Sequence, residues 1–120
     1  MPQVAVLSVY VADLEAAAAF YSQVLGFKIK QKIPPYVVVL EHEGLEVVLC
    51  QAEGPTRLDY PKASGAVPGI ATENLKKSIE ALKSKKVELL HSEPQEFPGG
   101  VYVAFRDPSG NVLELLEFRK

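Results

Sequence analysis

Apolar residues in the first half of the chain follow a strand period, then a helical period, then a strand period again. Residues 4–11 are almost wholly apolar and rich in valine, which predicts a buried strand. Asp13 is a residue type favoured at helix N-caps, and apolar side chains then recur at helical spacing until Gly26, a typical helix stop. Three more strands are predicted over residues 27–32, 36–40 and 45–50, with a short hairpin connection at residues 41–44.

The order strand, helix, strand, strand, strand is predicted again in the second half. A short strand at residues 67–71 precedes Asn74, which can cap a helix that runs to about Lys85. The remaining strands are predicted over residues 87–90, 101–105 and 112–118, with an Asp-Pro-Ser-Gly turn at residues 107–110. The loop at residues 92–100 is a candidate lid, because Gly99 and Gly100 offer hinge freedom and Phe97 offers an apolar cap.

Residues 53–65 hold glycines and prolines with little periodicity, which is typical of a linker. The sequence therefore predicts one domain, residues 1–120, built from the modules 1–52 and 66–120. Each module buries its helix on one face of its sheet, so the other face stays open unless it meets a second module. We expect an α+β fold in which two modules side by side form a curved sheet with a concave pocket for a small molecule.

Composition narrows the class of protein. The 120 residues include 13 basic and 15 acidic ones, a balance that argues against a nucleic-acid partner. Cys50 is the only cysteine, so no internal disulfide is expected. The longest uncharged stretch near the start, residues 2–12, is too short to span a bilayer and lacks the pattern of a signal peptide. We expect a cytoplasmic protein with no membrane partner.

Two segments resemble the signatures of a known family. The opening segment reads Val-Tyr-Val-Ala-Asp-Leu at residues 9–14, then Phe-Tyr at 20–21 and Val-Leu-Gly-Phe at 24–27. The closing segment, residues 105–115, reads Phe-Arg-Asp-Pro-Ser-Gly-Asn-Val-Leu-Glu-Leu. Together they resemble the vicinal oxygen chelate superfamily, which includes glyoxalase I, the bleomycin-resistance proteins and the extradiol dioxygenases. The resemblance implies two βαβββ modules in a partly closed barrel, a homodimer and a small-molecule ligand.

The resemblance also implies four metal-ligand positions, which in this chain are Val6, Val48, Val67 and Glu114. Valine has no atom that can bind a metal, and one carboxylate alone holds a divalent ion weakly. We therefore expect no metal and no other cofactor. The alternative is a weakly bound divalent metal with Glu114 as its remaining ligand.

Glu114 is the strongest candidate for chemistry. Strand alternation puts it on one face with Val112 and Leu116, and it points into the concavity if the helices cover the Leu113 side. It is then a ligand anchor or a general acid/base, unless it is a remnant of a metal site or bonds a neighbouring strand. His91 is a candidate general base beside it, or a solvated residue at a strand end.

Two functions follow from these residues. In the first, the chain binds a small organic molecule in its concave pocket without catalysis. A role in protein contacts alone is less favoured, because it would leave that pocket without a function. In the second, it is a lyase, isomerase or dioxygenase with Glu114 as acid/base, together with His91, or as the remaining metal ligand. The expected ligand contacts are Val6, Val48, Val67, Phe97, Tyr102 and Glu114, with Tyr36 and Tyr60 as further aromatic residues that line the mouth or pack in the core.

Overall fold

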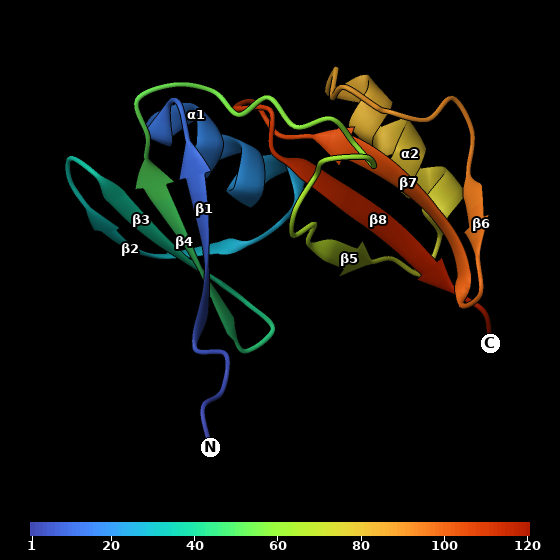
Figure 1. Cartoon of the computed structure of the whole chain (residues 1–120), viewed down its shortest axis with the longest axis horizontal. Coiled ribbons are helices and arrows are strands. Elements are labelled where there is room, and N and C mark those ends of the chain that lie inside the picture. The colour runs from blue at the N-terminus through green and yellow to red at the C-terminus, as the bar shows by residue number, and fades with distance from the viewer. The chain divides into compact units, whose positions relative to one another are not determined.

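The computed structural model describes residues 1–120, which form two compact units, Met1–Thr56 and Arg57–Lys120. Each unit is a four-stranded mixed sheet with one α-helix against it (Figure 1). The predicted α+β class with two βαβββ modules is confirmed. Neither helix has the length and apolar character that a membrane span requires.

In the first unit the strand order is β1-β4-β3-β2, with β1 parallel to β4 and the other neighbours antiparallel. The elements are β1 (Val6–Val11), α1 (Leu14–Ala19), β2 (Lys28–Ile33), β3 (Val37–His42) and β4 (Leu45–Gln51). The predicted single helix is in fact two pieces, because α1 continues as a π-helical turn, η1 (Phe20–Val24), in which Leu25 N–H donates to Phe20 O. Periodicity over so few residues cannot separate the two helix types.

In the second unit the strand order is β5-β8-β7-β6, again with a parallel first pair. The elements are β5 (Gly69–Ala71), α2 (Leu75–Ser84), β6 (Gln95–Phe97), β7 (Gly100–Arg106) and β8 (Val112–Phe118).

The helix of each unit begins with the same two hydrogen bonds. Asp13 caps α1 by accepting from Ala16 N–H at 3.1 Å, and Asn74 caps α2 by accepting from a main-chain N–H at 3.0 Å. The last strand supplies the second bond, since Gln51 Oε1 accepts from the first N–H of α1 and Glu117 Oε1 from that of α2. These bonds fix each helix to one face of its own sheet.

Two expectations for the second unit were wrong. Residues 87–90 do not form a strand, and only Leu89 makes a single bridge, to Phe105. The edge strand is β6, which lies inside the predicted lid and turns directly into β7 through Pro98 and Gly99. The glycine pair thus permits a tight turn: a Cβ at Gly100 would lie 2.0 Å from a main-chain oxygen of β8. The segment predicted as a lid thus contains an edge strand at residues 95–97 and is not one continuous loop.

Strand register sorts the side chains of each sheet onto two faces. We call the face toward the unit's own helix the helix face and the other the open face. The helix faces carry the buried apolar residues Val9, Val11, Val38, Leu40, Val47 and Leu49 in the first unit and Val103, Phe105, Leu113 and Leu115 in the second.

Candidate functional site

Glu114 lies in the middle of β8, on the open face of the second sheet. Its neighbours Leu113 and Leu115 are buried on the helix face, while Glu114 is half-buried and lies opposite Ala104 of β7 and Gly69 of β5. Strand alternation therefore places Glu114 on the face with Val112 and Leu116, as expected. Gly69 has no side chain, and the Leu116 side chain of β8 lies 2.7 Å from where its Cβ would be, while Ala104 is fully buried.

The Glu114 carboxylate accepts a hydrogen bond from the Tyr60 hydroxyl at 2.5 Å. Tyr60 comes from the segment before β5, 54 residues away in the sequence. Burial raises the pKa of the Tyr60 phenol above its ordinary value, and the hydrogen bond to the negatively charged Glu114 raises this pKa further. Tyr60 is thus held as a neutral donor. A carboxylate has room for about four hydrogen bonds, so acceptor positions remain on Glu114 beside the one that Tyr60 uses.

Aromatic rings extend from Tyr60 across the same region. The ring centroids of Tyr60 and His91 are 5.9 Å apart, those of His91 and Tyr102 5.5 Å, and those of Tyr102 and Phe97 5.9 Å. Phe97 in turn contacts Phe118 at 6.0 Å. Every pair is edge-to-face, a geometry in which the positive edge of one ring is attracted to the negative face of the next. The structure thus brings Glu114, His91, Tyr102 and Phe97 together in one cluster.

His91 is oriented by the main chain of β7. Its Nδ1 accepts a hydrogen bond from Ala104 N–H at 3.1 Å, which leaves the ring proton of the neutral imidazole on Nε2. His91 makes no hydrogen bond with Glu114; both residues instead contact Tyr60. The structure therefore places His91 and Glu114 on either side of Tyr60, which both residues contact, and not in direct contact with each other.

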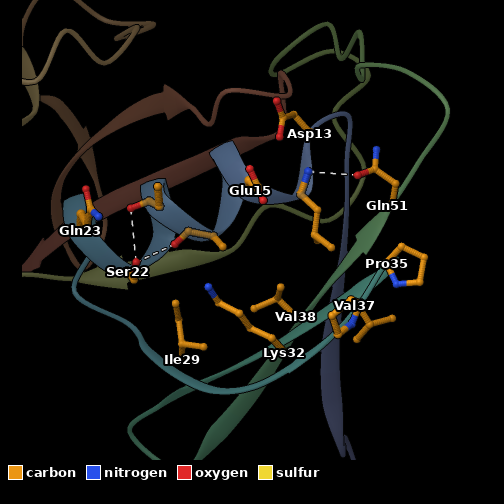
Figure 2. Close-up of a pocket in the computed structure, with 14 residues that line it drawn as sticks. Asp13, Glu15, Ser22, Gln23, Ile29, Lys32, Pro35, Val37, Val38 and Gln51 are labelled. Atoms are coloured by element: carbon orange, nitrogen blue, oxygen red, sulfur yellow. Dashed lines mark hydrogen bonds between the residues drawn. The ribbon is translucent and has the colours of Figure 1, made fainter.

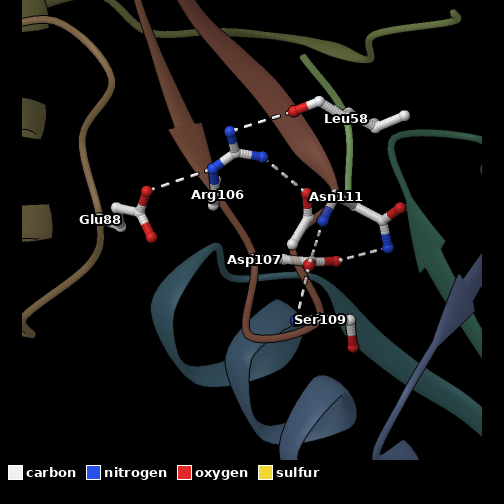
Figure 3. Close-up of polar contacts among 7 residues, drawn as sticks. Leu58, Glu88, Arg106, Asp107, Ser109 and Asn111 are labelled. Atoms are coloured by element: carbon white, nitrogen blue, oxygen red, sulfur yellow. Dashed lines mark hydrogen bonds and ion pairs between the residues drawn. The ribbon is translucent and has the colours of Figure 1, made fainter. Parts of the chain in front are cut away.

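Arg106, at the end of β7, fixes the segment that carries Tyr60 (Figure 3). Its guanidinium donates to Leu58 O at 3.2 Å and to Gly110 O at 3.0 Å, and it pairs with Glu88 at 3.2 Å. Leu58 lies two residues before Tyr60. Arg106 therefore holds the segment that precedes Tyr60 against the β7–β8 hairpin, which also carries Glu114.

The hairpin itself is held by a buried carboxylate. Asp107 is 4% exposed and accepts hydrogen bonds from Ser109 N–H at 2.9 Å, Asn111 N–H at 2.9 Å and Asn111 Nδ2 at 3.1 Å. The Asp107 side chain therefore holds the predicted turn at residues 107–110 together through these hydrogen bonds, and they fix the start of β8 (Figure 3).

The other candidate ligand positions carry hydrocarbon side chains. Val6 and Val48 lie on the open face of the first sheet, on the neighbouring strands β1 and β4. Val67 precedes β5 in the second unit and is half-buried. Within either unit no three His, Cys, Asp or Glu side chains gather in an arrangement that could hold a metal ion. The residues at the four positions do not fit a divalent metal, because only Glu114 supplies a donor atom.

Sequence reasoning missed two parts of this cluster. Tyr60 was expected only as a residue of the mouth or core, since no periodicity links a loop residue to a strand 54 positions away. Phe118 was not singled out, although it shares the alternation of Glu114 and Leu116 along β8 and the same rule places it on the open face.

Comparisons with known proteins give a consistent family. A model described as the Glyoxalase/Bleomycin resistance protein/Dioxygenase superfamily matches residues 3–115. The uncharacterized protein YetH of Bacillus subtilis is 35% identical over 127 residues, covering 96% of this chain and 98% of that protein. The mitochondrial methylmalonyl-CoA epimerase of Bos taurus is 30% identical over 130 residues, covering 92% of this chain and 71% of the epimerase.

Among solved structures, the chain is similar to TnmS3, an antibiotic binding protein from Streptomyces sp. CB03234. The TM-score is 0.72 at 22% identity, and the match covers 99% of this chain and 98% of TnmS3. At this level of identity the likeness shows a common fold.

Proposed function

Because the chain belongs to the glyoxalase/bleomycin resistance protein/dioxygenase superfamily, we propose that it binds a small, flat organic molecule and does so without a divalent metal. The ligand lies on the open face of the second sheet and presents a hydrogen-bond donor to Glu114. Rings of the cluster, above all Tyr102 and Phe97, contact its apolar body. Val67, which belongs to the same unit as Glu114, is an apolar contact in this proposal, and Val6, Val48 and Val67 have no role as ligands to a metal.

The observation that carries the proposal is the state of Glu114. One oxygen of the carboxylate accepts from Tyr60, whose ring begins the aromatic cluster, and no cation is paired with the carboxylate. A half-buried carboxylate with free acceptor positions favours a ligand that donates to it. A flat ligand adds contact area against the rings at little entropic cost, since the rings already hold one another in place.

Benzamidine is a suitable probe, because it is flat and its amidinium can donate two hydrogen bonds to one carboxylate. With EDTA present, we expect benzamidine to shift the amide resonances of Tyr60, His91, Tyr102 and Glu114 in a titration followed by NMR. Glu114→Gln should weaken binding about tenfold, the worth of one charge-assisted hydrogen bond. Glu96→Gln is the matched control, since Glu96 is in the same unit with an 84% exposed side chain and lies on the far side of the sheet edge. Resonance shifts that lie elsewhere, or an unchanged affinity in Glu114→Gln, would contradict the proposal.

Metal content provides a second test. Purified protein should hold far less than one divalent ion per chain. A stoichiometric ion that disappears in Glu114→Ala together with a catalytic activity would overturn the metal-free proposal.

A second candidate function is isomerisation, which the identity to an epimerase favours. Inversion at a carbon centre next to a carbonyl requires removal of a proton, and Glu114 is the carboxylate available as a base. The test is exchange of the α-proton of methylmalonyl-CoA in D₂O, with Glu114→Gln as the inactive control. Absence of exchange by protein that binds benzamidine would leave binding as the function.

We also propose that the chain forms a homodimer. The open face of the first sheet exposes Val6, Tyr10 and Ile33 at 42%, 61% and 46%, an apolar surface that favours association. Sedimentation equilibrium tests this: a mass of one chain at micromolar concentration would contradict it.

A further inference from the structure

A pocket lies in the first unit, on the helix face of its sheet. Its volume is about 620 Å³, within the range of roughly 300–1,000 Å³ that is usual for small-molecule sites. One wall is α1 with η1, and the other is formed by β2 and β3 (Figure 2). All the lining residues belong to the first unit, so this pocket is separate from the Glu114 cluster and from the open-face positions Val6 and Val48.

Small side chains on the helix leave this space open. Ala18, Ala19 and Ser22 line the wall of α1 and η1, whereas the helix α2 of the second unit buries Leu75, Ile79 and Leu82 against its sheet. Ser22 also folds back, since its hydroxyl donates to Ala18 O at 2.7 Å. The strand opposite, β2, is exposed along its whole length. The large buried side chains of the first helix, Phe20 and Tyr21, do not line the pocket, so its helix wall carries small side chains.

A β-bulge in β2 aims a lysine into this space. Ile29 pairs with Leu40 and Lys32 pairs with Val38, both on the helix face, although Lys32 comes three positions after Ile29. A regular strand would place them on opposite faces; the irregularity at residues 29–31 puts both toward the helix. In Figure 2 the Lys32 side chain extends from β2 toward the helix, across the pocket.

Lys32 is the positive group of the pocket, and it has no carboxylate partner. The neighbouring Lys30 is paired with Glu46 on the open face, whereas Lys32 takes part in no ion pair. The polar groups of Gln51 are already used, by Leu14 N–H, Ala12 O and Ala52 O. An anionic group entering the pocket would thus find one free donor, Lys32.

From this geometry we propose that the pocket binds a small amphipathic monocarboxylate, with its carboxylate on Lys32 and its apolar body against Ala18, Ile29 and Val38. Val38 is 5% exposed and Ala18 6%, so the floor of the pocket is apolar. Asp13 and Glu15 line the far end, at the start of α1, and repel a carboxylate there. Their charges orient the ligand with its anionic end toward Lys32.

Octanoate is the probe, with octan-1-ol and octylammonium as neutral and cationic controls. In an NMR titration of the full chain, octanoate should shift the amides of residues 14–23, 29–33 and 36–38, and both controls should bind more weakly. Lys32→Met keeps an unbranched side chain, one atom shorter, and removes its charge. It should weaken octanoate binding about fivefold, the upper range for an exposed ion pair. Lys28→Met, in the same strand but opposite Glu41, should leave the affinity unchanged.

Two further variants separate this site from the one proposed above. Ala19→Leu fills the pocket from an exposed helix position and should also weaken octanoate, whereas Glu114→Gln should have no effect on it. Equal binding of octan-1-ol, an unchanged affinity in Lys32→Met, or shifts outside the first unit would each overturn the proposal. If benzamidine does not bind at Glu114, the octanoate result still tests the pocket beside α1 independently.

Discussion

Replacing Tyr60 with phenylalanine removes one hydroxyl from the Glu114 cluster and leaves the ring in place. The bond it breaks, from Tyr60 to the Glu114 carboxylate, is a hydrogen bond to a charged group, worth about 1.5–3 kcal/mol when both partners are fully buried. Both residues are half-buried, and water can hydrate Glu114 from the open face, so we expect a loss near 1 kcal/mol. For a domain of this size that lowers Tm by about 3–5 °C.

The same variant changes the dependence of stability on pH. The folded state raises the pKa of Tyr60 above its ordinary value of 10.0, so it favours the protonated phenol. The stabilisation is complete below pH 10 and is lost as the pH rises further, because the unfolded chain ionises first. The free energy of unfolding should therefore fall more steeply above pH 10 in the wild type than in Tyr60→Phe.

Urea unfolding at a series of pH values measures both effects, and absorbance of tyrosinate at 295 nm follows the titration directly. Tyr36→Phe is the matched control, since Tyr36 is 66% exposed in the other unit and its substitution should leave the stability unchanged. If Tyr60→Phe is as stable as the wild type and its stability falls above pH 10 as steeply as that of the wild type, the hydrogen bond to Glu114 is not made and the described cluster is wrong.

Three further substitutions test the frame that holds the cluster. Gly100→Ala places a Cβ 2.0 Å from Glu117 O and should cost about 3 kcal/mol or more, measured by thermal unfolding. Asp107→Ala removes the acceptor of three donors, one on the buried Ser109 and two on the half-buried Asn111, and should cost about 2–3 kcal/mol in urea unfolding. An equal stability would show that the turn closes without this side chain. Arg106→Met releases Leu58 and should lower the pKa of the Tyr60 phenol toward its ordinary value, which absorbance at 295 nm detects. A retained high pKa would show that Arg106 is not needed to position Tyr60.

Much of the fold followed from local pattern. Both helix caps, Asp13 and Asn74, were predictable because the cap is set by the chemistry of one side chain and the apolar period after it. The edge strand β6 was not predictable in this way. Its three residues, Gln95–Phe97, show no clear alternation, and they are a strand only because β7 offers a hydrogen-bonding edge.

Some features of the candidate site also follow from local rules, whereas others depend on contacts between distant segments. The face that Glu114 occupies follows from alternation along β8, which is a local rule. Its partner Tyr60 and the orientation of His91 by Ala104 depend on contacts between distant segments, which no local pattern encodes. The alanines that open the pocket beside α1 were visible in the sequence, but strong helix formers give no sign of whether the space next to them is filled.

The dissociation constant of benzamidine, measured by calorimetry with EDTA and again with excess Co²⁺, tests metal-free binding most directly. Because Val6, Val48 and Val67 supply no donor atom, we predict the same constant in both conditions and a weaker one in Glu114→Gln. Binding that appears only with the metal ion would contradict the account, since Glu114 would then act as a metal ligand and not as the acceptor for the ligand itself.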